Sequence, residues 1–237
     1  MTKKGGFLIK KAVWTGAVLC VAAVCAMVYA LTLSTYRAGA EAYYYDYVVA
    51  LDAGHGGIDG GVVGTTTGVR ESDLNLAMAY LIKDKLENCG FRTVMTRTDE
   101  NGLYGSATGG FKQRDMRRRR EIINEAKADM VISVHMNKFS SPSRSGPQVF
   151  YDGGSAAGKA LADSMQTMLN GFTGNGHSAL AGDYYMLKCT SAPSVIVECG
   201  FLSNPDDEKK LTDGVYRDSL AEVIVRGALY YMSGAGI

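Results

Sequence analysis

Three mostly apolar runs organise the chain after its N-terminal segment: residues 47–52, 130–134 and 194–197. Continuous apolar runs of this length are typical of buried strands in a parallel sheet. Each run leads into a polar side chain, which is His55 in a glycine-dense turn, then His135, then Glu198. Because parallel strands place their carboxyl ends at one edge of a sheet, we expect these three side chains to meet there.

Between the apolar runs, hydrophobic positions recur with the spacing of helices. We expect helices at about 72–89, 112–127, 155–170 and 207–232. Further strands are expected at 91–96, at 148–151 and, as a short edge strand, at 184–187. Ser72 and Asp73 offer an N-cap for the first helix. Strands that alternate with helices predict an α/β fold, a single domain with a mainly parallel (mixed) sheet flanked by helices on both faces.

The N-terminal segment has a different pattern, because residues 12–36 carry no charge and four lysines precede them within residues 1–11. The uncharged run is long enough for a membrane-spanning helix, which needs about 20 apolar residues. We expect an N-terminal transmembrane helix, a signal-anchor over 12–36, with 1–11 as a cytoplasmic basic tail and 37–46 as a linker. A cleaved signal peptide, cut near the small residues 38–40, is the alternative. Either arrangement places the domain of residues 47–237 outside the cytoplasm.

Composition limits the possible partners. The 237 residues have a formal net charge of +1, which gives no electrostatic reason to expect a nucleic-acid partner. Three cysteines follow the N-terminal segment, and Cys89, Cys189 and Cys199 fit no C-x-x-C motif. We therefore expect small buried cysteines and no disulfide framework.

The polar side chains at the predicted sheet edge are of the types that hold a catalytic metal. A catalytic zinc typically keeps three protein ligands and one open position, and imidazole and carboxylate groups are common ligands. His55 and His135 supply two ligands, and Glu71, at the start of the first predicted helix, is the candidate third. Glu198 is then the candidate general base of a metal-assisted hydrolase. The alternative is structural: hydrogen-bonded histidines, and a helix-start carboxylate at Glu71.

Four motifs follow one another along the chain: Leu-Asp-Ala-Gly-His-Gly-Gly at 51–57, Arg-Glu-Ser-Asp-Leu-Asn-Leu at 70–76, Ile-Ser-Val-His-Met-Asn at 132–137 and Val-Glu-Cys-Gly-Phe-Leu-Ser-Asn at 197–204. In order and spacing they resemble the zinc-dependent N-acetylmuramoyl-L-alanine amidases of the amidase-3 class, over essentially all of residues 47–235. The short loop at 138–147 and the N-terminal hydrophobic segment are most similar to the germination-specific, spore-cortex (CwlD-like) type.

This resemblance implies one zinc ion per chain, held by His55, Glu71 and His135, with Glu198 as the catalytic carboxylate. It implies hydrolysis of the amide between N-acetylmuramic acid and L-alanine in peptidoglycan. The work of such an enzyme is cell-wall or spore-cortex remodelling, including muramic-lactam formation and germination for the spore-cortex type. It acts at the extracytoplasmic face of the membrane, in the cell wall or in the forespore intermembrane space.

Other residues are weaker candidates for contacting substrate or supporting the ligands. His177 lies in a predicted loop, and Asn137 follows His135 by two residues. The arginine run at 117–120 spans the whole circumference of a helix, so it is mostly a solvated face. Arg119 best fits the family pattern within this run, and Arg97 is a similar candidate for holding substrate carboxylates.

Two other functions fit the same residues. One is a catalytically weak amidase-like protein that needs a binding partner for zinc loading or activity, and the other is a different zinc peptidase or deacetylase. The 138–147 loop is too short for a stable helix that would block the site. We therefore expect an open groove, with control through localisation, timing of expression or a regulatory protein.

Overall fold

The computed structural model describes residues 14, 16, 18–32 and 46–234. The chain divides into two compact units, residues 1–44 and 45–237, which are described separately. In the first unit, residues 18–32 are helical. Within the described residues, no helix has both the length and the apolar character needed to cross a membrane. The expected signal-anchor at 12–36, like its flanking tail and linker, lies partly or wholly outside the described residues.

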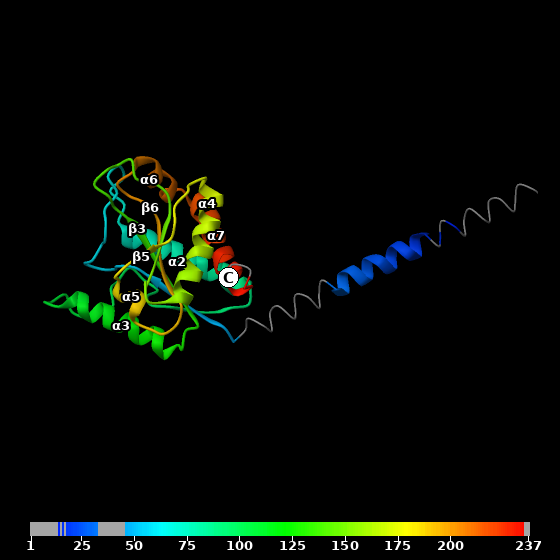
Figure 1. Cartoon of the computed structure of the whole chain (residues 1–237), viewed down its shortest axis with the longest axis horizontal. Helices are drawn as coiled ribbons and strands as arrows, with labels where there is room; N and C mark the ends of the chain where they lie inside the picture. Colours follow the sequence, from blue (N-terminus) through cyan, green and yellow to red (C-terminus); the bar gives the residue numbers. More distant parts are fainter. Residues whose placement is uncertain (1–13, 15, 17, 33–45, 235–237) are drawn as a thin grey trace, which may run out of the picture. The chain divides into compact units, whose positions relative to one another are not determined.

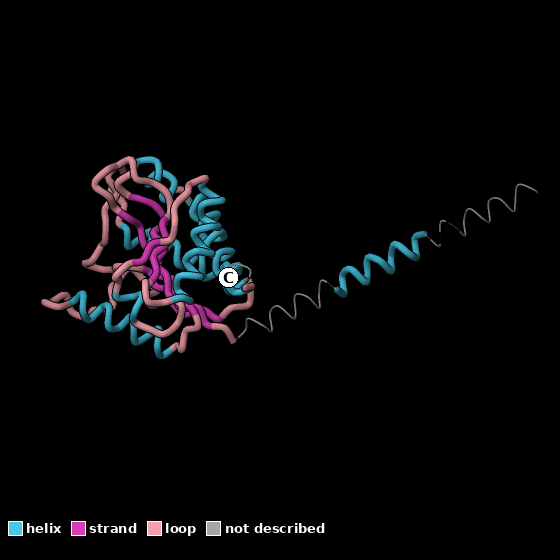
Figure 2. Tube along the Cα trace, viewed as in Figure 1, coloured by secondary structure: helices cyan, strands magenta, loops and turns pink. Residues whose placement is uncertain are grey.

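The second unit contains a six-stranded sheet in the order β2-β1-β3-β6-β4-β5 (Figures 1 and 2). Its strands are β1 (Val48–Ala53), β2 (Arg92–Met95), β3 (Met130–Asn137), β4 (Gln148–Tyr151), β5 (Leu180–Ala181) and β6 (Ser194–Phe201). β1 pairs in parallel with β2 and β3, and β3 pairs in parallel with β6. β4 runs antiparallel to β6 and parallel to β5. The expected mixed α/β sheet is confirmed.

Helices flank both faces of this sheet, as expected (Figure 1). They are α2 (Glu71–Asn88), α3 (Phe111–Glu125), α4 (Ala156–Thr173), α5 (Tyr185–Lys188), α6 (Pro205–Thr212) and α7 (Gly214–Met232). α2 and α4 each pack against α7 over one face, and α3 and α5 lie over the other. Ile123 of α3 and Met186 of α5 pack there on Ala50 and Val131 of the central strands. Burial of apolar strand side chains on both faces explains why the central strands read as continuous apolar runs.

Three expectations about local structure are wrong. The edge strand expected at 184–187 is the short helix α5, and β5 lies just before it at Leu180–Ala181. A four-residue apolar run cannot separate the two states by periodicity, and here Met186 and Leu187 are both buried, as a helical turn allows. The expected terminal helix is two helices, α6 and α7. Asp213 separates them with an extended backbone, and its side chain accepts a hydrogen bond from the Val215 N–H at 2.8 Å.

The third difference concerns the start of α2. Arg70 is the N-cap, with an extended backbone and no side-chain capping hydrogen bond, so Ser72 and Asp73 already lie inside the first turn. Glu71 is consequently the first helical residue, where the positive end of the helix favours a carboxylate. The start of the helix therefore places Glu71 at the carboxyl edge of the sheet.

Candidate active site

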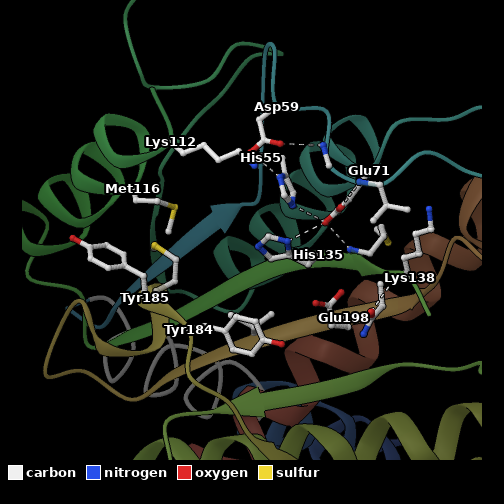
Figure 3. Close-up of a pocket in the computed structure, with 16 residues that line it drawn as sticks. His55, Asp59, Glu71, Lys112, Met116, His135, Lys138, Tyr184, Tyr185 and Glu198 are labelled. Carbon is white, nitrogen blue, oxygen red and sulfur yellow. Dashed lines mark hydrogen bonds and ion pairs between the residues drawn. The ribbon is translucent and has the colours of Figure 1, made fainter. Parts of the chain in front are cut away.

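Four polar side chains meet at the carboxyl edge of the sheet, each from a different element (Figure 3). His55 follows β1, His135 lies near the end of β3, and Glu71 begins α2. Glu198 of β6 is the register partner of His135 in the parallel pair of strands. The fold thus brings together the four residues that the sequence suggests for metal binding and acid–base chemistry.

The ligand atoms of His55, Glu71 and His135 all lie within 4.8 Å of one another. Oε1 of Glu71 is 3.2 Å from Nε2 of His55 and 3.0 Å from Nδ1 of His135. The imidazole rings are 5.1 Å apart and nearly perpendicular, at 80°. Two imidazole nitrogens and one carboxylate oxygen therefore converge on a single point, which is the arrangement that a bound cation requires.

Hydrogen bonds hold Glu71 in its ionised form. Its side chain is 2% exposed, and burial alone would favour the neutral carboxyl. The hydrogen bonds with His135 and His55 outweigh burial and keep the pKa of Glu71 well below its usual range. At His55 burial lowers the pKa, but hydrogen bonds with Glu71 and Asp59 raise it above its ordinary value. The carboxylate is thus an anion, the state in which it binds a metal.

Two glycines allow the backbone to lie close to the ligands. A Cβ atom on Gly54 would overlap the imidazole of His135, and one on Gly61 would overlap the carboxylate of Glu71. Gly61 also has a φ of +67°, which L side chains rarely adopt. The glycine-dense turn therefore allows close packing around these side chains, and only glycine fits at these two positions without a shift of a neighbouring side chain.

Further side chains orient the ligands from outside. Oδ2 of Asp59 lies 3.1 Å from Nδ1 of His55, on the ring atom opposite the one that faces Glu71. Nδ2 of Asn75 donates to Oε1 of Glu71 at 3.2 Å and to the Gly54 carbonyl at 3.1 Å. Such outer contacts fix the orientation of metal ligands. We did not predict Asp59 or Asn75 from the sequence, although Asn75 lies inside the 70–76 motif and Asp59 follows His55 by only four residues.

A buried ion pair lies under the turn that carries His55. Arg119 is 1% exposed, and its Nη1 lies 2.7 Å from Oδ1 of Asp52. Its Nη2 donates to the carbonyl of His55 at 2.5 Å. Burial opposes the charge on Asp52, but Arg119 and a hydrogen bond from Ser133 hold the pKa of Asp52 at about 2. Arg119 therefore holds the backbone of the turn that carries His55.

Glu198 has a different environment from Glu71. Its Oε2 is buried and has no hydrogen-bond partner among the described residues. Burial raises the pKa of Glu198 to about 7, and the nearby Glu71 charge adds to the increase, while His135 opposes it. The carboxylate lines a cavity of about 530 Å³ that also contains the three converging ligands. A titratable carboxyl group with one unpartnered oxygen thus lines the same cavity as the two histidines and Glu71.

The weaker candidates occupy three different positions. Asn137 lines the cavity, and its Oδ1 accepts a hydrogen bond from the Lys138 N–H at 2.7 Å. His177 is not among the residues that line the cavity and instead contacts the 138–147 loop, with Nε2 2.9 Å from the carbonyl oxygen of Ser145. Arg97 is buried and donates to the Gly54 carbonyl at 3.0 Å, so it supports the same turn as Arg119.

The 138–147 loop leaves the site accessible. It contains bends and a turn and no helix. The side chains of His55 and His135 remain 25% and 20% exposed. A metal held by these ligands would keep an open face toward the cavity, as hydrolytic chemistry requires.

Comparisons with known proteins give a consistent result. The family model for N-acetylmuramoyl-L-alanine amidases, Amidase_3, matches residues 49–230. The germination-specific N-acetylmuramoyl-L-alanine amidase of Bacillus subtilis (strain 168) is 34% identical over 194 residues, covering 80% of this chain and 81% of that protein.

Two solved structures are also similar to this chain. The CwlD amidase from Clostridioides difficile, in complex with the GerS lipoprotein, has a TM-score of 0.76 and 34% identity, covering 79% of this chain and 99% of that one. The catalytic domain of CwlV, an N-acetylmuramoyl-L-alanine amidase from Bacillus (Paenibacillus) polymyxa var. colistinus, has a TM-score of 0.70 and 29% identity. The match covers 79% of this chain and 98% of that one.

The buried pair under His55 generates a prediction for stability. Asp52→Asn leaves the Arg119 charge only partly compensated, so we expect a loss of about 3 kcal/mol in the free energy of unfolding at pH 7. The pKa of Asp52 is lowered in the folded state, so its contribution is present above about pH 4. The difference between wild type and variant should shrink as pH falls from about 4 toward 2. Urea unfolding at several pH values measures this.

The matched control for this prediction is Glu121→Gln, which removes an exposed partner of Arg118 on the same helix. Its cost should stay below about 1 kcal/mol, because exposed ion pairs contribute little. Equal losses in the two variants would contradict the role of the buried pair.

Proposed function

The chain belongs to the N-acetylmuramoyl-L-alanine amidase family (Amidase_3), as its four motifs suggest, and it is an amidase that acts on peptidoglycan. From this premise we propose that it is zinc-dependent, with one zinc ion held by His55, Glu71 and His135 and with Glu198 as the acid–base group. The observation that carries the proposal is the convergence of three ligand atoms within 4.8 Å beside a carboxylate whose Oε2 is buried and has no partner among the described residues.

The donor set fits zinc, because two imidazoles and one carboxylate form a known catalytic ligand set that leaves a position open. When bound, zinc polarises the scissile carbonyl and lowers the pKa of a water molecule. Hydrogen bonds already stabilise the ionised form of Glu71. Asp59 orients His55, and Asn75 orients Glu71. These residues therefore prepare the site before any substrate enters.

Glu198 performs the proton transfers in this proposal. Its carboxylate accepts the proton of the attacking water and delivers it to the amine nitrogen that leaves with L-alanine. A pKa near 7 suits both steps, since the group has to bind and release a proton within one turnover. This mechanism requires no nucleophilic serine or cysteine. Cys199 is 1% exposed and directly follows Glu198 in β6, so we expect its side chain on the opposite face of the strand.

The proposal also places the activity in the spore cortex or cell wall, outside the cytoplasm. Support comes from the 34% identity to a germination-specific amidase over four fifths of this chain. A regulatory protein partner is part of the proposal, because the similar CwlD amidase was solved in complex with the GerS lipoprotein.

We further propose that residues 12–36 anchor the chain in the membrane, with residues 1–11 on the cytoplasmic side. The uncharged run and the preceding lysines support this, and apolar side chains of the described helical part, such as Val21 and Val24, are exposed.

The proposed anchor predicts that the full chain stays with membranes after a high-salt wash and keeps its full mass. Replacing Val21 and Val24 with Asp should release it, whereas Val215→Asp, an exposed position of the second unit, should not. A soluble chain shortened near residues 38–40 would instead indicate a cleaved signal peptide.

The central prediction concerns Glu198. Glu198→Ala should reduce release of stem peptides from peptidoglycan by roughly 10²-fold or more while zinc content stays near one per chain, because a general acid–base group contributes this much. The measurements are product identification by mass spectrometry and metal analysis of the full chain. Glu222→Ala, an exposed carboxylate of α7, is the control and should keep full activity.

Other outcomes of this experiment identify the alternatives. A wild-type chain that is poor in zinc and inactive until a second protein is added would favour the partner-dependent form. Products other than free stem peptide and intact glycan would indicate a different peptidase or deacetylase. Loss of zinc in Glu198→Ala would contradict a purely acid–base role for this residue.

The close approach of Gly54 to His135 gives a prediction about metal binding. Gly54→Ala places a methyl group where the imidazole lies, so His135 has to move and zinc affinity should fall by roughly tenfold or more. Gly109→Ala is the matched control, because no atom lies near its added Cβ and its φ is not in the positive range. Competition with a zinc-binding dye measures both affinities. Wild-type affinity in Gly54→Ala would show that His135 is not a ligand.

A further inference from the structure

A second cavity adjoins the first along α3. Its volume is about 430 Å³, and its lining comprises Lys112, Gln113, Met116, Arg117, Arg120 and Tyr185. Three of these residues, Lys112, Met116 and Tyr185, also line the cavity that contains the proposed metal ligands. Figure 3 shows these three on one side of the histidine pair. The two cavities therefore form one groove that leads from the reaction site along the helix.

The wall of the second cavity is positively charged. Residues 113, 117 and 120 follow one another at helical i, i+4 and i+7 spacing, so they share one flank of α3. We call Gln113, Arg117 and Arg120 the basic strip, in which the two arginines carry the charge and Gln113 adds a neutral amide. Arg118 lies on another flank and pairs with Glu121 and Glu125, whereas the described structure contains no ion pair of Arg117 or Arg120. No acidic side chain lines the second cavity, and Lys112, which both cavities share, lies 3.5 Å from Asp59 of the first cavity.

We propose that the basic strip binds the carboxylates of the stem peptide, beyond the L-alanine at which the chain cleaves. This inference rests on the proposed function and adds a specificity site to it. The glycan strand offers no charge near the cleaved bond, because the lactyl carboxyl is itself in the amide. The free carboxylates of the substrate therefore lie on the peptide, and a planar guanidinium binds a carboxylate through two parallel hydrogen bonds.

The length of the strip agrees with a short peptide. Gln113 and Arg120 are seven residues apart, which is about 10 Å along a helix. An extended peptide advances about 3.3 to 3.6 Å per residue, so three to four residues span the strip. Met116 and Tyr185 supply apolar surface between the charges, against which the peptide side chains can pack.

Binding of the free peptide tests the proposal independently of catalysis. The probe is L-alanyl-γ-D-glutamyl-L-lysyl-D-alanine, with free carboxylates in one form and amidated carboxylates in another, titrated calorimetrically into the full chain. Arg117→Ala/Arg120→Ala should weaken binding of the acidic form by roughly tenfold, since each exposed ion pair contributes at most about 1 kcal/mol. The amidated form should bind wild type and variant within about twofold of each other. Arg118→Ala is the matched control and should retain wild-type affinity.

The kinetic counterpart uses muropeptides with the same two stem peptides. In the double variant we expect a KM for the acidic substrate that is higher by the same factor, with kcat unchanged. Equal affinity of the wild type for the acidic and amidated peptides, or the same loss in Arg118→Ala, would overturn the proposal. If a glycerol-phosphate oligomer bound more tightly than the acidic peptide, and the double variant lost this binding, the proposal would be overturned, and the strip would instead bind an anionic polymer of the wall. If the chain released no stem peptide at all, the proposed function would fall, while the titration would still decide whether the strip binds carboxylates.

Discussion

The site depends on one buried carboxylate. Oε1 of Glu71 contacts both proposed histidine ligands and accepts hydrogen bonds from the Asn75 side chain and the Met136 N–H, and Oε2 accepts from the Val62 N–H. Each donor compensates a charge that burial would otherwise neutralise. The glycine-rich turn, the start of α2 and the end of β3 are joined through this side chain. A shift in any of the three elements therefore moves all the proposed ligands.

Two flanks of the helix α3 contribute to the site in different ways. Its inner flank buries Arg119, whose guanidinium holds the backbone carbonyl of His55 and pairs with Asp52. A buried ion pair adds little net stability, but removing one partner is costly, so the pair fixes the position of the turn more than it strengthens the fold. The outer flank carries Arg117 and Arg120 along the groove. Anchoring the helix through Arg119 thus also fixes where those exposed charges lie relative to the reaction site.

The sequence predicts the parts of this molecule that depend on repeated patterns. The central strands are visible as apolar runs because both faces of the sheet are covered, and the convergence of His55, His135 and Glu198 follows from their positions at the ends of those strands. Tertiary contacts decide the rest. Tyr185–Lys188 is a helix whose Met186 packs with Ile123 of α3 and with the central strands, and Arg119 is buried within an arginine run that looks solvated. Asp59 and Asn75 act through contacts with side chains distant in the chain, which no local pattern reveals.

Glu71 and Glu198 line the same cavity as the two histidines, yet their pKa values shift in opposite directions, and their surroundings explain why. Glu71 accepts hydrogen bonds at both oxygens, so its pKa falls despite burial, and it remains an anion suited to a cation. Oε2 of Glu198 is buried and has no partner among the described residues, so desolvation dominates and the pKa of Glu198 rises to about 7. Paired titratable groups whose environments separate their pKa values are the usual sign of divided roles in catalysis. The proposed assignment of ligand and acid–base group therefore follows from the hydrogen bonds that each carboxylate receives, since the two side chains are chemically identical.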